Sequence, residues 1–136
     1  MPWIVDTCLV IDVLEVDPAF GRASAALLDA RLEEGLVLCP VSFVELAPAF
    51  DGNLERQRFF LGRVGIRFDE DWQPPDTLAA HAAWHRHIRK RRAGQSLRRP
   101  VADILIGALA CRFRGLLTRN PRDFAADFPD LRLVTP

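Results

Sequence analysis

Short apolar runs alternate with longer segments of helical periodicity along most of this chain of 136 residues. The runs that predict strands are 2–6, 36–39, 65–68, 115–118 and 131–135. The segments that predict helices are 18–35, 40–50, 53–64, 76–92, one that begins after Pro100, and a short one within 121–128. Because strands separated by helices pair in parallel, the pattern predicts an α/β fold: a mainly parallel sheet of four to five strands with helices on both faces.

The length and composition indicate one domain. A chain of 136 residues has the size of an ordinary domain, and no repeat, low-complexity segment or long linker divides it. We therefore expect a single domain over residues 1–136. We expect no membrane association and a cytoplasmic location.

The net charge of zero conceals an uneven distribution of charge. No acidic residue occurs from Thr77 through Ala102. The basic residues of that window are Arg86, Arg89, Lys90, Arg91, Arg92, Arg98 and Arg99. Such an excess suits a polyanion such as nucleic acid, and it equally suits the solvated face of a helix.

Four acidic residues lie where a parallel sheet carries function, beyond the carboxyl ends of its strands. Asp6 closes the first predicted strand, and Glu45 lies about one helical turn beyond the second. Asp103 belongs to the first turn of the helix after Pro100, and Asp123 follows the 115–118 strand after a short loop. Each residue alone is also an ordinary turn or capping residue, but all four are predicted at one edge.

Two of these carboxylates lie in strongly apolar surroundings. The stretches "SFVELA" around Glu45 and "VADILIGALA" around Asp103 leave no obvious solvated face, so we expect both side chains to be buried and compensated. Arginine, backbone amides or a divalent cation such as Mg²⁺ or Mn²⁺ provide such compensation. Gly107 lies on the same helical side as Asp103, and we expect another backbone, such as that of the Glu45 helix, to pass close to it.

Four stretches together resemble the PIN-domain ribonucleases, and specifically the VapC-type toxins of type II toxin–antitoxin pairs. They are "IVDTCLVID" at the start, "VSFVELA", "VADILIGALA" and "LLTRNPRDF", in the order the family has them. The resemblance implies an α/β/α sandwich around a parallel sheet, a homodimer, and Mg²⁺ or Mn²⁺ held by acids at the edge of the sheet. It also implies RNA as the substrate and an antitoxin protein as a partner.

The resemblance assigns roles to individual residues. Asp6, Glu45 and Asp103 match the three characteristic acids, and Asp123 is the fourth candidate for catalysis and metal binding. One common form of the family has an acid directly after "TR", whereas this chain has Asn120 there, which leaves a second metal position open. Supporting oxygen atoms are expected from Thr7, Ser42, Thr118 and Asn120. Arg119 and the basic residues between 86 and 99 are the expected contacts to RNA phosphates.

The sequence thus predicts a Mg²⁺- or Mn²⁺-dependent endoribonuclease that cleaves RNA phosphodiester bonds as the toxin of a toxin–antitoxin pair. Two alternatives remain open. One is a catalytically inactive PIN-like module that binds RNA or protein through the basic helix, which is the helix predicted over 76–92. The other is a housekeeping RNA-processing nuclease. The basic helix equally suits the acidic tail of an antitoxin.

Overall fold

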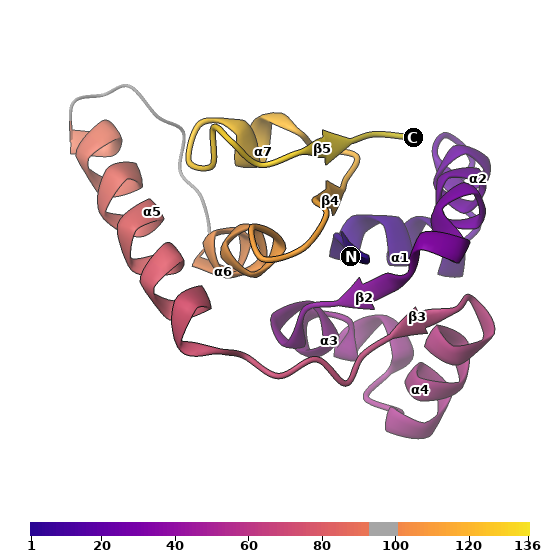
Figure 1. Cartoon of the computed structure of the whole chain (residues 1–136). Coiled ribbons are helices and arrows are strands. Elements are labelled where there is room, and N and C mark those ends of the chain that lie inside the picture. The colour runs from indigo at the N-terminus through magenta and orange to yellow at the C-terminus, as the bar shows by residue number, and fades with distance from the viewer. Residues whose placement is uncertain (93–100) are drawn as a thin grey trace.

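The computed structural model describes residues 1–92 and 101–136, and it places five parallel strands in one sheet (Figure 1). The strands are β1 Trp3–Val5, β2 Leu36–Leu38, β3 Ile66–Arg67, β4 Leu116–Leu117 and β5 Leu133–Val134, in the order β3-β2-β1-β4-β5. The chain fills one side of β1 with β2 and β3 before it returns to the other side with β4 and β5. The direction of strand order therefore reverses between β1 and β4, the place where ligands bind in open α/β sheets.

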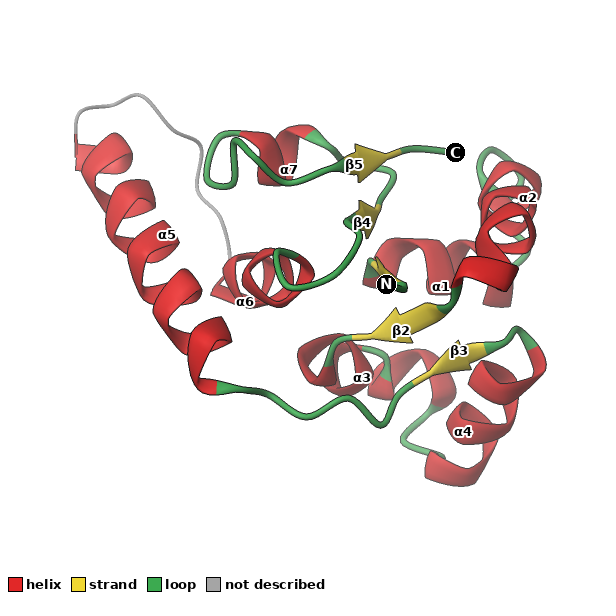
Figure 2. Ribbon diagram, in the orientation of Figure 1, coloured by secondary structure: helices red, strands yellow, loops and turns green. Residues whose placement is uncertain are grey.

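Helices cover both faces of the sheet, which gives the predicted α/β/α arrangement (Figure 2). The helices are α1 Thr7–Leu14, α2 Gly21–Arg31, α3 Pro40–Glu45, α4 Leu54–Arg63, α5 Pro74–Arg92, α6 Val101–Ala110 and α7 Arg122–Ala125. Side chains of a strand alternate between the faces. Trp3 and Val5 accordingly pack in a cluster with Leu9 of α1, and Ile4 packs in another with Ile106 of α6.

The long helix α5 is the outermost element, and it packs on α6 (Figure 1). Small residues on α5, Ala80 and Ala83, share a cluster with Ile104 and Ala108 of α6. No helix in the described parts of the chain has the length and apolar character needed to cross a membrane.

The predicted strands are confirmed within two residues at each end, but the helices differ in three places. The helix predicted over 18–35 is shorter, since α2 is Gly21–Arg31 and a 3₁₀ helix, Leu32–Glu34, follows it. Helix α1 was not predicted, because its sequence "TCLVIDVL" is a nearly continuous apolar run that directly follows a strand. The helix predicted over 40–50 is divided into α3 and a 3₁₀ helix, Ala47–Phe50. Pro48 explains the division, since it has no N–H for the hydrogen bond that would continue α3.

Candidate active site at the carboxyl edge of the sheet

Asp6 and Thr118 follow the two strands between which the strand order reverses. The Asp6 N–H donates to the carbonyl of Leu117 (2.9 Å), which continues the pairing of β1 with β4. Both side chains are buried, and the Thr118 hydroxyl donates to the Asp6 carboxylate at 2.7 Å. Asn120 donates its own N–H to that hydroxyl (3.0 Å), so the loop after β4 fixes the orientation of Thr118.

The Asp6 carboxylate is held by neutral donors. Besides Thr118, the Cys8 thiol donates to the same oxygen (3.4 Å). Burial raises the pKa of Asp6, the hydrogen bonds from Thr118, Cys8 and the Thr7 backbone lower it in part, and the charge of Glu45 raises it. Burial and the nearby Asp6 charge raise the pKa of Cys8 to about 12, so Cys8 remains a thiol and keeps its proton for Asp6.

Glu45 is joined to this group through the first residue of α1. The Thr7 hydroxyl donates to the Glu45 carboxylate at 2.8 Å. One turn earlier on α3, the Ser42 hydroxyl is buried, and within the described residues it has no hydrogen-bond partner. Thr7 is therefore joined to Glu45, and Ser42 lies three residues before Glu45, on the same side of α3.

The expected burial of Glu45 and Asp103 is wrong. Glu45 is exposed, because α3 ends there and its last residue faces away from the core. Asp103 is only half-buried, because it lies in the first turn of α6 and not among the core residues that follow. Asp123 is exposed in the first turn of α7. Asp6 is thus the one buried member of the four acids.

The four acids do not form a compact metal cage. Across the described ranges, 1–92 and 101–136, no three acidic, histidine or cysteine side chains lie close enough together to hold a metal ion. The structure brings Asp6 and Glu45 together through Thr7, and neither Asp103 nor Asp123 completes a group of three with them. The donor set of carboxylates and hydroxyls nevertheless has the chemistry that Mg²⁺ and Mn²⁺ prefer.

The expectation for Gly107 is corrected by the structure. A Cβ on Gly107 would lie 2.3 Å from Cε2 of the Phe128 ring. The close neighbour is therefore an aromatic side chain from the loop after α7, and not the backbone of α3. Gly107 allows α6 to receive this ring in the cluster that α5 and α6 share.

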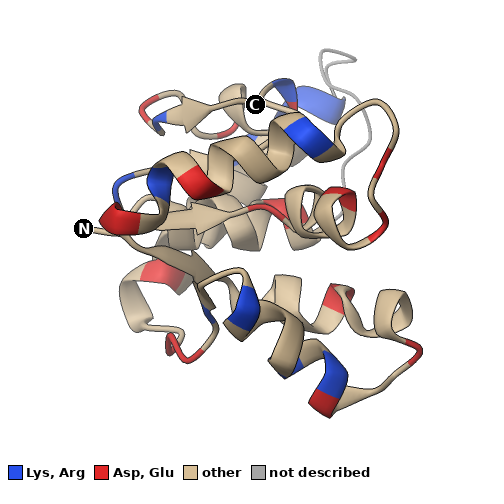
Figure 3. Ribbon diagram, turned by 90° about the vertical axis from the view of Figure 1, so that its right-hand side faces the viewer, with Lys and Arg blue, Asp and Glu red and all other residues tan. Residues whose placement is uncertain are grey.

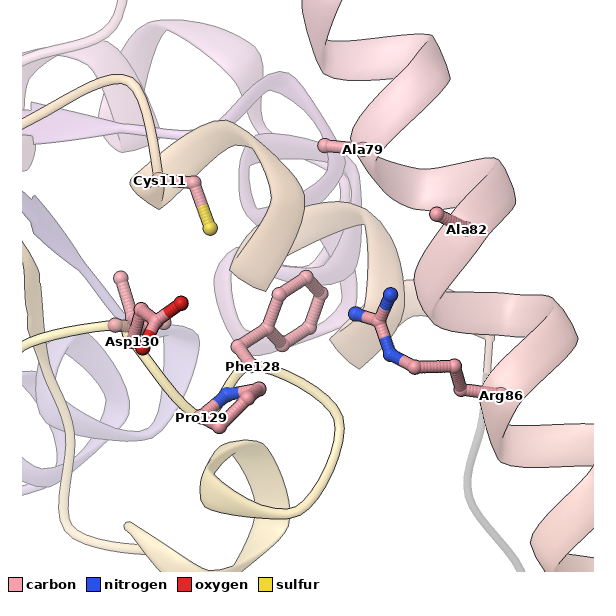
Figure 4. A pocket seen from close by; sticks show the side chains of 8 residues that line it. Ala79, Ala82, Arg86, Cys111, Phe128, Pro129 and Asp130 are labelled. Carbon is pink, nitrogen blue, oxygen red and sulfur yellow. The ribbon is translucent and has the colours of Figure 1, made fainter.

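Two cations of α5, the helix that carries the basic residues from Arg86 to Arg92, are bound to other parts of the protein. Arg86 donates to the carbonyl of Asp127 (2.6 Å), and Lys90 donates to the carbonyl of Ala126. Figure 4 shows the Arg86 guanidinium turned toward Phe128, beside a cavity of about 250 Å³ that both residues line. Arg89 and Arg91 are exposed. Arg98, Arg99 and the side chain of Arg92 lie outside the described residues.

Arg119 is joined to Asp12, a residue that no motif in the sequence marks as functional. Its Nε and Nη2 donate to the two carboxylate oxygens of Asp12 at 2.9 and 3.0 Å, and Asp12 is 2% exposed. Ser24 donates to the same carboxylate. Asp12 is a single acid in an apolar run, and the same pattern marked Asp103 as a candidate residue. Nothing in the sequence, however, linked Asp12 to a partner 107 residues away.

The sheet order and the acids at its switch point define an α/β protein with the PIN-domain fold that the resemblance implied. Among solved structures, the chain is similar to VapBC2 from Rickettsia felis, crystallised with a DNA fragment from the promoter of the pair. The TM-score is 0.68 at 16% sequence identity, and the match covers 99% of this chain and 98% of the other. At this identity the likeness shows the fold. No protein-family model and no curated protein sequence matches the chain.

Proposed function

We propose that this protein is a metal-dependent endoribonuclease, and that it is the toxin of a toxin–antitoxin pair. The observation that carries the proposal is a contrast among the buried aspartates. Asp12 is paired with Arg119, Asp76 with Arg112 and Asp127 with Lys90. In the described part of the chain, Asp6, which is 6% exposed, takes its hydrogen bonds from neutral donors, and the charge of Glu45 raises its pKa.

A buried carboxylate without a cationic partner is costly, and such groups concentrate at functional sites. A bound Mg²⁺ or Mn²⁺ would offset the cost, lower the pKa of a bound water and neutralise charge on the RNA phosphate. Asp6 and Glu45 are the proposed ligands, joined by Asp103 and Asp123 from the first turns of α6 and α7. Thr118 and Cys8 orient Asp6, Asn120 orients Thr118, and Thr7 orients Glu45.

The proposed partners are single-stranded RNA, an antitoxin protein and a second copy of this chain, in the cytoplasm. Exposed Arg89 and Arg91 on α5 support RNA binding, because arginine pairs with phosphate oxygens. The shared fold with a chain from the VapBC2 structure supports an antitoxin partner.

The central experiment compares RNA cleavage by the wild type, Asp6→Asn and Asp103→Asn in Mg²⁺ or Mn²⁺. We expect cleavage that EDTA abolishes and that each substitution reduces at least 100-fold. Asp69→Asn, at an exposed aspartate outside the site, is the matched control and should cleave as the wild type does. Cleavage that persists in EDTA, or that is unchanged in both site variants, contradicts the proposal.

Thermal unfolding tests whether a cation binds at Asp6, without relying on enzymatic activity. The pKa of Asp6 is raised in the folded protein, so the folded state favours the protonated form. Its contribution to stability is therefore present at low pH and is lost as pH rises through the folded pKa. At pH 7 in EDTA, we expect Asp6→Asn to raise the Tm, because Asn removes the charge and keeps an oxygen for Thr118.

Added Mn²⁺ should then raise the Tm of the wild type and leave that of Asp6→Asn unchanged. An equal Mn²⁺ shift in both proteins would place the cation elsewhere.

A catalytically inactive module that binds RNA or protein is the second candidate. The observation that favours it is the lack of a three-ligand group among the described residues. RNA binding without cleavage in either metal would support it. A housekeeping nuclease is distinguished from a toxin by its gene neighbourhood, since a toxin gene is expected beside a small overlapping upstream reading frame.

A further inference from the structure

Phe20 is an exposed aromatic residue whose ring is covered on one side by a cation. It directly precedes α2, is 41% exposed, and is not a member of the hydrophobic clusters found among the described residues. The guanidinium carbon of Arg119 lies 4.2 Å from the centre of its ring, a cation–π arrangement. A ring that contributes little to the core, yet is held by an arginine, is suited to binding.

The support of this ring is fixed from two directions. Arg119 is bound to both carboxylate oxygens of Asp12, which also accepts a hydrogen bond from Ser24. The Asp17 carboxylate accepts the backbone N–H groups of Ala19 and Phe20, both at 2.8 Å. The backbone that carries Phe20 and the guanidinium that packs on its ring are therefore in place before any ligand arrives, which reduces the entropy lost on binding.

The ring also lies close to the proposed cleavage site. Arg119 directly follows Thr118, whose hydroxyl donates to Asp6. Its partner Asp12 belongs to α1, the helix that begins at Thr7, directly after Asp6. The ring is therefore linked to Asp6 by a chain of contacts through Arg119, Asp12 and Thr118.

We propose that Phe20 is a stacking platform for a nucleobase of single-stranded RNA beside the cleavage site. This rests on the proposed nuclease function for its choice of ligand. Proteins bind unpaired bases by stacking them on aromatic side chains, because every base has a π-face. Arg119 is then a positioning residue that supports the ring and places positive charge near the RNA backbone. This role differs from the direct contact to an RNA phosphate that the sequence predicted for Arg119.

The test uses a single-stranded RNA 12-mer that carries 2-aminopurine, whose fluorescence falls when the base stacks. Binding is measured in EDTA for the wild type, Phe20→Ala, Phe20→Leu and Phe20→Trp. We expect affinity to fall about 5- to 100-fold in Phe20→Ala, with loss of quenching. Phe20→Leu should lose quenching as well, because it keeps the apolar volume without the flat ring, and Phe20→Trp should restore both signals.

Phe59→Ala is the matched control, because Phe59 is 70% exposed on α4. It should bind as the wild type does, and a double-stranded RNA should show no dependence on Phe20. Equal affinity in Phe20→Ala and Phe59→Ala, or full quenching in Phe20→Leu, overturns the platform. Failure of the wild type to bind single-stranded RNA also overturns the platform, and it would indicate that the Phe20 ring contacts a protein partner instead.

Cleavage of the same 12-mer in Mn²⁺ separates this inference from the nuclease assignment. Quenching that depends on Phe20 without any cleavage supports the platform and refutes the nuclease. Cleavage with no dependence on Phe20 supports the nuclease and refutes the platform.

Discussion

At the scale of single residues, Gly107 shows how one missing side chain shapes the packing of a helix. The Phe128 ring occupies the space that a Cβ would need, and Phe128 is itself only 5% exposed. The ring borders the cavity of about 250 Å³ beside Arg86, but its edge at Gly107 is closely packed. Glycine in a helix costs about 1 kcal/mol relative to alanine, and here the cost is offset by close packing between α6 and the loop after α7.

We predict that Gly107→Ala destabilises the protein by about 1–3 kcal/mol, because the ring must shift within a packed core. Gly62→Ala is the matched control. Gly62 is also helical, and an added Cβ there meets no atom within 4 Å. It should stabilise the protein by about 0.5–1 kcal/mol through helix propensity alone. Urea unfolding of both variants measures the difference, and effects of the same sign would show that Phe128 accommodates the methyl group.

At the scale of elements, α5 is fastened at both ends by polar contacts. Arg112, just after α6, donates from Nε and Nη2 to the two oxygens of Asp76, each at 2.9 Å, and from Nη1 to Glu70 at 3.2 Å. Near the other end, Arg86 and Lys90 hold the backbone that follows α7. These contacts position α5 over the small residues by which it packs on α6.

We predict that Arg112→Ala costs about 3 kcal/mol of stability, because Asp76 is 1% exposed and would lose its cationic partner. Arg67→Ala is the control, since its pair with Asp69 is exposed and should contribute about 0–1 kcal/mol. Denaturant unfolding gives both values. A similar small loss in the two variants would mean that Asp76 is readily solvated when Arg112 is removed.

At the scale of the whole molecule, the net charge is zero and both signs are spread over the ribbons in the view of Figure 3. The basic helix therefore presents less positive charge for RNA than the sequence indicates. Arg86 and Lys90 donate to carbonyl oxygens of the segment after α7, and Arg86, Arg89 and Arg91 are exposed. Among the described residues of α5, RNA affinity should depend mainly on Arg89 and Arg91, because donors of Arg86 and Lys90 are used within the protein.

We predict that the double variant Arg89→Gln, Arg91→Gln weakens binding of single-stranded RNA at low salt. The slope of log K against log salt should become shallower by ~1.4, at ~0.7 for each RNA phosphate that the protein no longer neutralises. The double variant Arg58→Gln, Arg63→Gln removes two exposed arginines from α4 and is the control. An equal change of slope in the control would show that RNA binding has no preference for α5.

The sequence by itself determined the strands, the parallel α/β class and the edge of the sheet at which Asp6 lies. Apolar runs and helical periodicity reflect burial along the chain, and residues that follow parallel strands must share an edge. The same local signals failed for Glu45, because exposure at the end of a short helix depends on what packs beside it.

Only the tertiary structure decided the partners of the charged and aromatic residues. Arg119 with Asp12, Arg112 with Asp76, and the Phe128 ring against Gly107 each join distant segments. Composition and periodicity show which side chains need a partner, but packing selects the partner, because an interaction energy depends on the distance and orientation that the assembled fold imposes. The contrast between paired aspartates and Asp6, on which the proposed function rests, became visible only at that level.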